Sequence, residues 1–265
     1  MTEIIVSLED LVSAEYGLIL CYPKYDRGEV ERRIGEMRKL GVRAVCFSGN
    51  KVVAGLPVLG KGYVGIVVLA LLEDGRRAAL KISRIDSKPN RIIHEARMIS
   101  MANRVGVGPK ILGYTSNLLM MEYIEGHLLP EWIMGIIGDR ERGSRRLRWV
   151  LRDILEQCWR LDSIGLDHGE LSWADKHIIV DGWDRPHIID FEAASDGRKT
   201  SNVTSISQYL FVRGRMASLV ANILGHIEAE RLIQALRTYK MERSRENFES
   251  ILKILGLLEL DRDSL

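Results

Sequence analysis

The sequence predicts an α+β protein of two lobes, in which strands come first and helices follow. Two patterns carry this prediction. Strand-like segments separated by glycine turns fill much of residues 42–83, whereas helical periodicity dominates after Tyr123. The helices expected in that second half lie near residues 146–164, 203–212, 216–240 and 245–258. At 265 residues, 46% of them hydrophobic, the chain is long enough for two small lobes.

The N-terminal part opens with a predicted helix at residues 28–40. Val30, Ile34 and Met37 recur there at helical spacing, and Gly41 supplies a C-cap. A strand is expected directly afterwards, at Val42–Phe47. Changes in periodicity divide the chain into an α/β extension packed on the first lobe (residues 1–55), the β-rich first lobe (56–124) and the helical second lobe (125–265).

Composition excludes several classes of protein. Lysine and arginine (38) nearly balance aspartate and glutamate (36), so a net charge of +2 does not by itself indicate nucleic-acid binding. Cys21, Cys46 and Cys158 lack the spacing of metal ligands, which favours reduced thiols in a core. The acidic N-terminus is unlike a signal peptide, and the longest apolar run, Val64–Leu72, is too short to cross a bilayer. We therefore expect a cytoplasmic protein with no membrane partner.

The first chemical motif is the glycine-rich segment GKGYVGIV at residues 60–67. Glycines are common in this chain, and an ordinary flexible hairpin is the competing interpretation. In a dinucleotide-binding fold the last glycine would open a helix, but the apolar, β-branched run Ile66–Leu72 predicts a strand. A hairpin lid fits this context better, because glycines let backbone amides approach phosphate oxygens.

A lysine and a glutamate follow this hairpin at positions that suit a phosphate-binding pair. Lys81 lies between Leu80 and Ile82 on the next predicted strand, where a buried ammonium needs an anionic partner. Glu95 shares one face of a predicted helix, residues 89–104, with apolar side chains, and Pro89 is expected near the first turn of that helix. The competing interpretation places both charges in solvent.

The second half contains DHGELSWADKHIIVD at residues 167–181 and PHIIDFEAAS at residues 186–195. Asp190 directly follows a short apolar strand, a position from which carboxylates commonly hold Mg²⁺ against phosphates. A simple turn residue is the alternative.

With these motifs the chain resembles the protein-kinase-like superfamily from about Leu56 to Ala194. Its short C-terminal part is similar to RIO-like kinases, aminoglycoside phosphotransferases and the small kinase of the KEOPS complex. The resemblance implies a two-lobed protein-kinase-like fold with a β-rich N-lobe and a shortened helical C-lobe. It also implies that ATP and Mg²⁺ are bound, with Lys81 and Asp190 converging on one triphosphate.

The resemblance also assigns roles to residues. Met120 would be the gatekeeper and residues 122–124 the adenine-binding hinge. The implied nucleotide-binding residues are Gly60, Lys61, Gly62, Tyr63, Gly65, Val67, Lys81, Glu95, Met120, Glu122 and Ile124. The implied catalytic residues are Glu170, His168 and Lys81, and the implied metal ligands are Asp190 with His177 or Asp175.

Two departures accompany these roles. Glu170 stands where the family has a catalytic aspartate, and Glu192 replaces the glycine after the metal-binding residue. In this loop the family also has a metal-binding asparagine. The equivalent position in this chain remains open between Asp175 and His177, and Lys176 is an alternative contact of the γ-phosphate.

The phosphate acceptor is the least defined part of this interpretation. The DHGELS, KHIIVD and NVTS segments resemble an archaeal group that includes an RNA kinase, which implies a ribose 2′-hydroxyl of tRNA as acceptor. A kinase acting on protein serine or threonine, or on a small molecule, is the first alternative. A catalytically inactive nucleotide-binding module, suggested by Glu170 and Glu192, is the second.

Clustered basic residues give independent support for an RNA partner. Candidate phosphate contacts are Arg140, Arg142, Arg145, Arg146, Arg148, Arg198 and Lys199, with Arg213 and Arg215 further along. A solvated helix start is the competing interpretation of the first five. Among the tryptophans, Trp173 is the candidate for stacking on a base, and the others suit a core.

Overall fold

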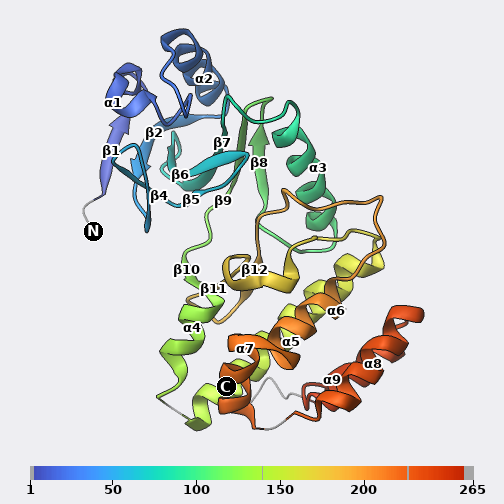
Figure 1. The fold of residues 1–265 in the computed structure, drawn as a ribbon. Helices are drawn as coiled ribbons and strands as arrows, with labels where there is room; N and C mark the ends of the chain where they lie inside the picture. The colour runs from blue at the N-terminus through green and yellow to red at the C-terminus, as the bar shows by residue number, and fades with distance from the viewer. Residues whose placement is uncertain (1–2, 139, 226, 260–265) are drawn as a thin grey trace. The chain divides into compact units, whose positions relative to one another are not determined.

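The computed structural model describes residues 3–138, 140–225 and 227–259, and the chain divides into two compact units (Figure 1). The N-terminal unit runs to Ser100 and also includes Pro109–Tyr123, whereas the C-terminal unit comprises Met101–Gly108 and the chain from Ile124 onwards. An antiparallel sheet dominates the first unit and helices dominate the second. The predicted α+β class is therefore confirmed.

The main sheet of the N-terminal unit is antiparallel and has the strand order β1-β2-β6-β7-β9-β8, with β5 pairing on β6. Its strands are β1 (Ile4–Ser7), β2 (Val42–Phe47), β5 (Gly60–Lys61), β6 (Gly65–Leu72), β7 (Arg77–Ser83), β8 (Ile111–Tyr114) and β9 (Leu118–Glu122), and β3 (Lys51–Val53) pairs β4 (Leu56–Val58) separately. Because β2 pairs directly with β6, residues 1–55 build part of this sheet and do not pack on it as a separate extension.

Helix α2 (Arg27–Lys39) covers the core of this unit, and η1 (Asp10–Val12) and α1 (Ala14–Gly17) precede it. The Asp26 carboxylate caps α2 by accepting a hydrogen bond from the Glu29 amide at 2.8 Å. The predicted helix and the strand β2 after it are confirmed. Helix α3 (Arg91–Arg104) starts later than predicted, because Asn90 has a positive φ of 61°. Pro89 therefore lies before the helix and not in its first turn.

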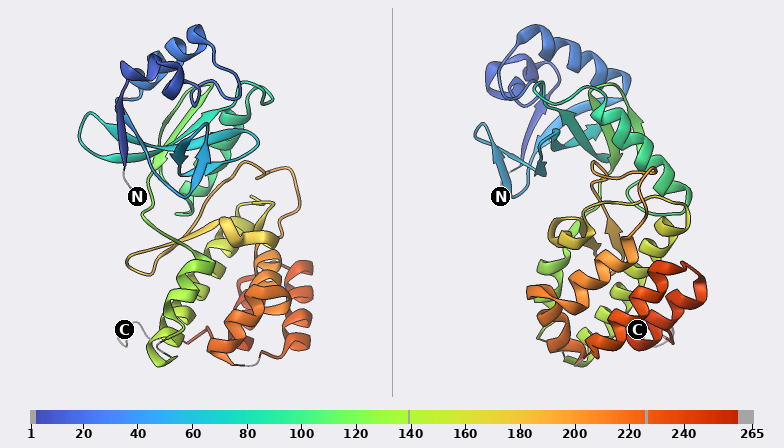
Figure 2. Two further views of the ribbon diagram at one scale, coloured as in Figure 1. Left: turned by 60° about the vertical axis from the view of Figure 1, so that its left-hand side comes forward. Right: turned by 45° about the vertical axis from the view of Figure 1, so that its right-hand side comes forward.

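The C-terminal unit combines a small sheet with several helices, which gather as the green to red ribbons of Figure 2. Strands β10 (Gly126–Leu128), β11 (Ile178–Asp181) and β12 (Pro186–Ile188) form the antiparallel sheet. The helices are α4 (Leu129–Ile136), α5 (Arg140–Ser163), η2 (Leu171–Lys176), α6 (Asn202–Ser207), η3 (Gln208–Val212, a π-helix), α7 (Gly214–Leu224), α8 (Ala229–Met241) and α9 (Arg245–Ile254). Helix α5 packs against α4, α6 and α7.

Several boundaries in this unit differ from prediction. The single helix expected over residues 216–240 is two helices, α7 and α8, since Gly225 ends α7 with a positive φ of 90°. Helix α5 begins six residues earlier than expected, at Arg140, and α4 and β10 were not predicted. None of the described helices combines the length and apolar character needed to cross a membrane.

A buried carboxylate joins four segments of the C-terminal unit. Asp162 of α5 accepts hydrogen bonds from both Asn202 nitrogens (3.0 and 2.8 Å), the Val203 amide (3.3 Å) and the Tyr239 hydroxyl (3.0 Å). The Asn202 side chain also accepts a hydrogen bond from the His168 amide at 2.8 Å. Burial raises the pKa of Asp162, against the hydrogen bonds that lower it. The Asn202 side chain is thus engaged in this network, and no side-chain hydrogen bond caps the start of α6.

Candidate functional site

The glycine-rich segment is a hairpin, as predicted. Gly60 and Lys61 pair with Val67 and Ile66, and the Gly62 amide donates to the Gly65 carbonyl at 2.8 Å. Gly65 is required by packing, because a Cβ there would lie only 2.7 Å from the Ile82 carbonyl oxygen. Tyr63 in the turn is 93% exposed. The hairpin is thus pressed closely against strand β7 and has an exposed turn.

Lys81 and Glu95 form a buried ion pair in the N-terminal unit. Lys81 lies opposite Val67 in the β6–β7 register, and its Nζ is 2.7 Å from Glu95 Oε2 of α3. The two residues are only 4% and 1% exposed. The solvated interpretation of both charges is therefore wrong. Such a pair holds together because either charge left alone in the interior would be strongly unfavourable.

The implied gatekeeper and hinge residues follow on strand β9. Met120 is buried and lies opposite Leu80. The Glu122 amide donates to the Lys110 carbonyl at 2.8 Å, and the Glu122 carboxylate accepts from the Lys110 amide at 3.2 Å. The backbone amide of Glu122 therefore already has a hydrogen-bond acceptor within the protein. The chain passes from one unit to the other between Tyr123 and Ile124.

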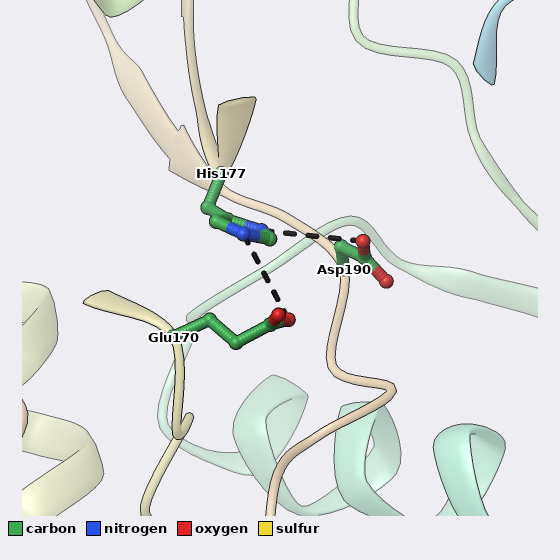
Figure 3. Close-up of side chains that lie close together, drawn as sticks. All are labelled: Glu170, His177 and Asp190. Carbon is green, nitrogen blue, oxygen red and sulfur yellow. Dashed lines mark ion pairs between the residues drawn. The ribbon is translucent and has the colours of Figure 1, made fainter. Parts of the chain in front are cut away.

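In the C-terminal unit, Glu170, His177 and Asp190 come together (Figure 3). Glu170 precedes η2, His177 ends it, and Asp190 follows β12 with a positive φ of 66°. His177 Nε2 is 3.8 Å from a Glu170 oxygen, and His177 Nδ1 is 4.0 Å from an Asp190 oxygen. A hydrogen bond from the Ile189 amide to the His177 carbonyl, 2.9 Å long, holds the two segments in this register.

This geometry separates the two alternatives for the asparagine position. Asp175 is exposed, and its carboxylate accepts a hydrogen bond from the Tyr209 hydroxyl at 3.0 Å. Burial is the largest cause that raises the pKa of Tyr209, followed by the nearby Asp175 charge. Lys176 is also exposed. Of the candidates, His177 lies with Asp190 and Glu170, and Asp175 belongs to a different contact.

The donor atoms of Glu170, His177 and Asp190 suit a divalent cation. One atom from each residue lies within 4.8 Å of the others. Burial lowers the pKa of His177, although the two carboxylates oppose this, so the imidazole is neutral at pH 7. Its Nδ1 is buried and has no hydrogen-bond partner among the described residues. Two carboxylates fit Mg²⁺ or Mn²⁺, and the imidazole adds preference for Mn²⁺ over Mg²⁺.

His168 lies behind this cluster, not in it. Its side chain is fully buried, and Nε2 donates to the Ile189 carbonyl at 3.0 Å. Its ring contacts Phe191 edge-on, with centroids 5.0 Å apart. Burial lowers the pKa of His168 to about 4, so it is neutral at pH 7. The residue implied as catalytic thus contacts, through the Ile189 carbonyl, the segment that carries Asp190.

The predicted basic cluster is not one open surface. Arg146 makes a two-pronged ion pair with Asp184 (2.6 Å), Arg148 donates to the Gly256 carbonyl (3.2 Å) and Arg198 pairs with Asp167 (2.6 Å). Arg142, Arg145 and Lys199 are exposed, and the side chain of Arg140 lies outside the described structure. Structural contacts therefore occupy at least three of these residues.

The solvent exposure of the tryptophans differs in part from the prediction. Trp173 is 76% exposed, as a stacking residue requires, but Trp183, which was assigned to the core, is 78% exposed. Asp167 was not singled out from the sequence, although besides binding Arg198 it accepts hydrogen bonds from the Ser201 amide and hydroxyl at 2.8 and 3.1 Å. Its partners lie more than thirty positions along the chain, so no local pattern identifies it.

No protein-family model matches the chain. A stretch of 100 residues, 38% of this chain, is 31% identical to the uncharacterized protein MJ1211 of Methanocaldococcus jannaschii and covers 79% of that protein. The name of that relative states no activity.

Proposed function

We propose that this chain, which belongs to one family with the archaeal protein MJ1211, is an ATP-dependent kinase with a protein-kinase-like fold. The observation that carries the proposal is the buried Lys81–Glu95 pair on the strand next to the glycine hairpin. An ordinary structural ion pair does not need a glycine hairpin beside it. The same lysine, glutamate and glycine hairpin serve to orient ATP phosphates in protein kinases.

In this proposal the two units supply different groups. Hairpin amides and Lys81 would bind phosphate oxygens, while Asp190 and His177 would hold a divalent ion in the C-terminal unit. The ion would neutralise negative charge on the phosphates. The acceptor hydroxyl oxygen forms a bond to the γ-phosphorus as the bond to the ADP oxygen breaks, and Glu170 accepts the hydroxyl proton. This base is the least demanding part, since positioning and charge neutralisation dominate phosphoryl transfer.

We further propose a ribose 2′-hydroxyl of tRNA as the acceptor. The support is the resemblance of the segments around Glu170, His177 and Asn202 to an archaeal group that includes an RNA kinase. The longer side chain of Glu170, compared with aspartate, also suits a wider acceptor site.

The test is phosphate transfer from γ-labelled ATP. The purified chain is incubated with archaeal tRNA or with a protein extract, and we expect RNase-sensitive label on tRNA that decreases steeply as salt rises. Lys81→Ala and Asp190→Ala should abolish it, whereas Lys51→Ala and Asp196→Ala, which remove exposed charges, should not. Label on protein alone would contradict the proposal that tRNA is the acceptor. ATP binding without any transfer would favour the inactive module.

A further inference from the structure

A cavity of about 840 Å³ lies in the C-terminal unit beside the turn that follows Glu170. Residues of η2, α6, η3, α7 and α8 line it, and all of them belong to this one unit. Its volume is within the range of ligand pockets in proteins, roughly 300–1,000 Å³. The π-helix η3 forms part of the wall, and such helices are frequent at functional sites.

The side chains that line this cavity are strongly cationic. The lining includes four cations, Arg213, Arg215, Arg237 and Lys240, and one acidic residue, Asp175, whose carboxylate already accepts a hydrogen bond from the Tyr209 hydroxyl. All four cations are exposed, and within residues 3–138, 140–225 and 227–259 none of them forms an ion pair. Arg146 and Arg198, by contrast, have acidic partners. Unneutralised cations around a cavity attract an anionic ligand.

An aromatic surface adjoins these cations. Trp173 lines the cavity and is 76% exposed. Its amide donates to the Glu170 carbonyl at 3.0 Å, so the tryptophan and the candidate base belong to one short turn. Nucleobases stack on exposed indole rings of this kind.

We infer that this cavity binds a single-stranded nucleic acid, with the four cations contacting backbone phosphates and Trp173 stacking on a base. An acidic peptide would neutralise the cations, but it has no nucleobase to stack on the Trp173 ring. The identification of the bound strand as the phosphate acceptor rests on the proposed function. Binding itself needs neither ATP nor the Lys81–Glu95 pair.

The experiment measures binding of a fluorescein-labelled single-stranded RNA of about 15 nucleotides, close to the footprint of single-strand binding sites. Fluorescence anisotropy is recorded without ATP at several salt concentrations. The test variants are Arg213→Ala/Arg237→Ala and Trp173→Ala, with Trp173→Phe to retain a ring. The matched controls are Arg231→Ala, an exposed arginine on α8 that pairs with Glu228, and Trp183→Ala, an equally exposed tryptophan. Circular dichroism confirms that each variant is folded.

We expect the double arginine variant to reduce the slope of log K against log salt by about 1.4, because each phosphate contact on a single strand contributes about 0.7. Trp173→Ala should weaken binding by about tenfold and Trp173→Phe by less, since stacking contributes a factor of this order. Both controls should bind like the wild type. Test variants indistinguishable from their controls would overturn the inference, as would tight binding of poly-glutamate in place of RNA.

The outcome also separates this inference from the proposed function. RNA binding that depends on the cavity, in a protein that transfers no phosphate from ATP to any acceptor, would contradict the kinase proposal alone. Phosphate transfer to tRNA that is unchanged in the cavity variants would contradict only the inference that the cavity binds the RNA.

Discussion

The two units differ in how closely their charged side chains contact one another and in how far these side chains are buried. In the N-terminal unit, Lys81 and Glu95 contact each other at 2.7 Å and are almost fully buried. In the C-terminal unit, Glu170 and Asp190 stay 3.8 and 4.0 Å from His177, and the two carboxylate side chains are 39% and 36% exposed. In the first group two opposite charges are in contact, whereas in the second each carboxylate lies farther from the imidazole than hydrogen-bond distance.

This difference indicates how each unit would respond to a ligand. A closed ion pair is already positioned and needs its partner for stability, so damage to it should appear even in the protein alone. A set of donors spaced around a metal position gains further counter-charge from a cation, so its contribution should increase when that cation is present. Each prediction below tests one side of this contrast.

The largest effect is expected on phosphate transfer. Lys81→Ala and Asp190→Ala should each lower kcat by about a thousandfold, because each removes charge stabilisation of the transferred phosphate. Steady-state ADP release with tRNA present measures this loss. A variant of either residue that retains near wild-type turnover would show that this residue takes no part in catalysis.

The N-terminal pair should also matter for stability. Glu95→Leu leaves the buried Lys81 ammonium without the carboxylate of Glu95 and should lower the free energy of unfolding by about 3 kcal/mol. Urea denaturation measures the change. Lys81→Met combined with Glu95→Leu should recover most of the loss, since apolar side chains then replace both charges. A double variant as unstable as the single one would contradict the ion-pair explanation.

The C-terminal cluster should respond to metal. At a Mn²⁺ concentration about one hundred times its Kd, the wild type should gain about 2.7 kcal/mol of stability, and EDTA should remove that gain. His177→Ala and Asp190→Ala should lose the response. Asp175→Asn is the matched control, because Asp175 contacts Tyr209 and lies apart from the cluster. Loss of the metal response in Asp175→Asn but not in His177→Ala would reverse our assignment.

The smallest effect is expected at the candidate base. Glu170→Gln should lower kcat by only about tenfold, since a loose transition state places little demand on proton removal. The comparison is made with Asp190→Ala in the same assay. Equal losses in the two variants would show that Glu170 has more than this secondary role.

Features that depend on neighbouring residues were predictable, and features that depend on distant ones were not. The alternation of apolar residues around Lys81 and the spacing within α2 are local signals, and both gave correct elements. The pairing of Arg146 with Asp184 and of Arg198 with Asp167 joins distant segments, so these arginines were predicted as RNA contacts. The position of His177 between two carboxylates likewise depends on how β11 and β12 return to each other.

The cavity was missed for a related reason. Its cations come from the η3–α7 junction, α7 and α8. A sequence that appeared to hold one helix over residues 216–240 gave no indication that residues of two separate helices line one cavity. Arg213 and Arg215 were noted as basic residues, but Arg237 and Lys240 were not. The break at Gly225, a single residue, separates α7 from the helix that carries those two cations.

The buried Asp162 network has a consequence for local motion. The amide protons of Asn202 and Val203 donate to a side chain within the interior, not to a preceding helical turn. Both should exchange with deuterium as slowly as the central turns of α5, although they lie at the very beginning of a short helix, where fraying is usual. The start of α6 is thereby held as firmly as a core element, and the backbone of His168 is held with it.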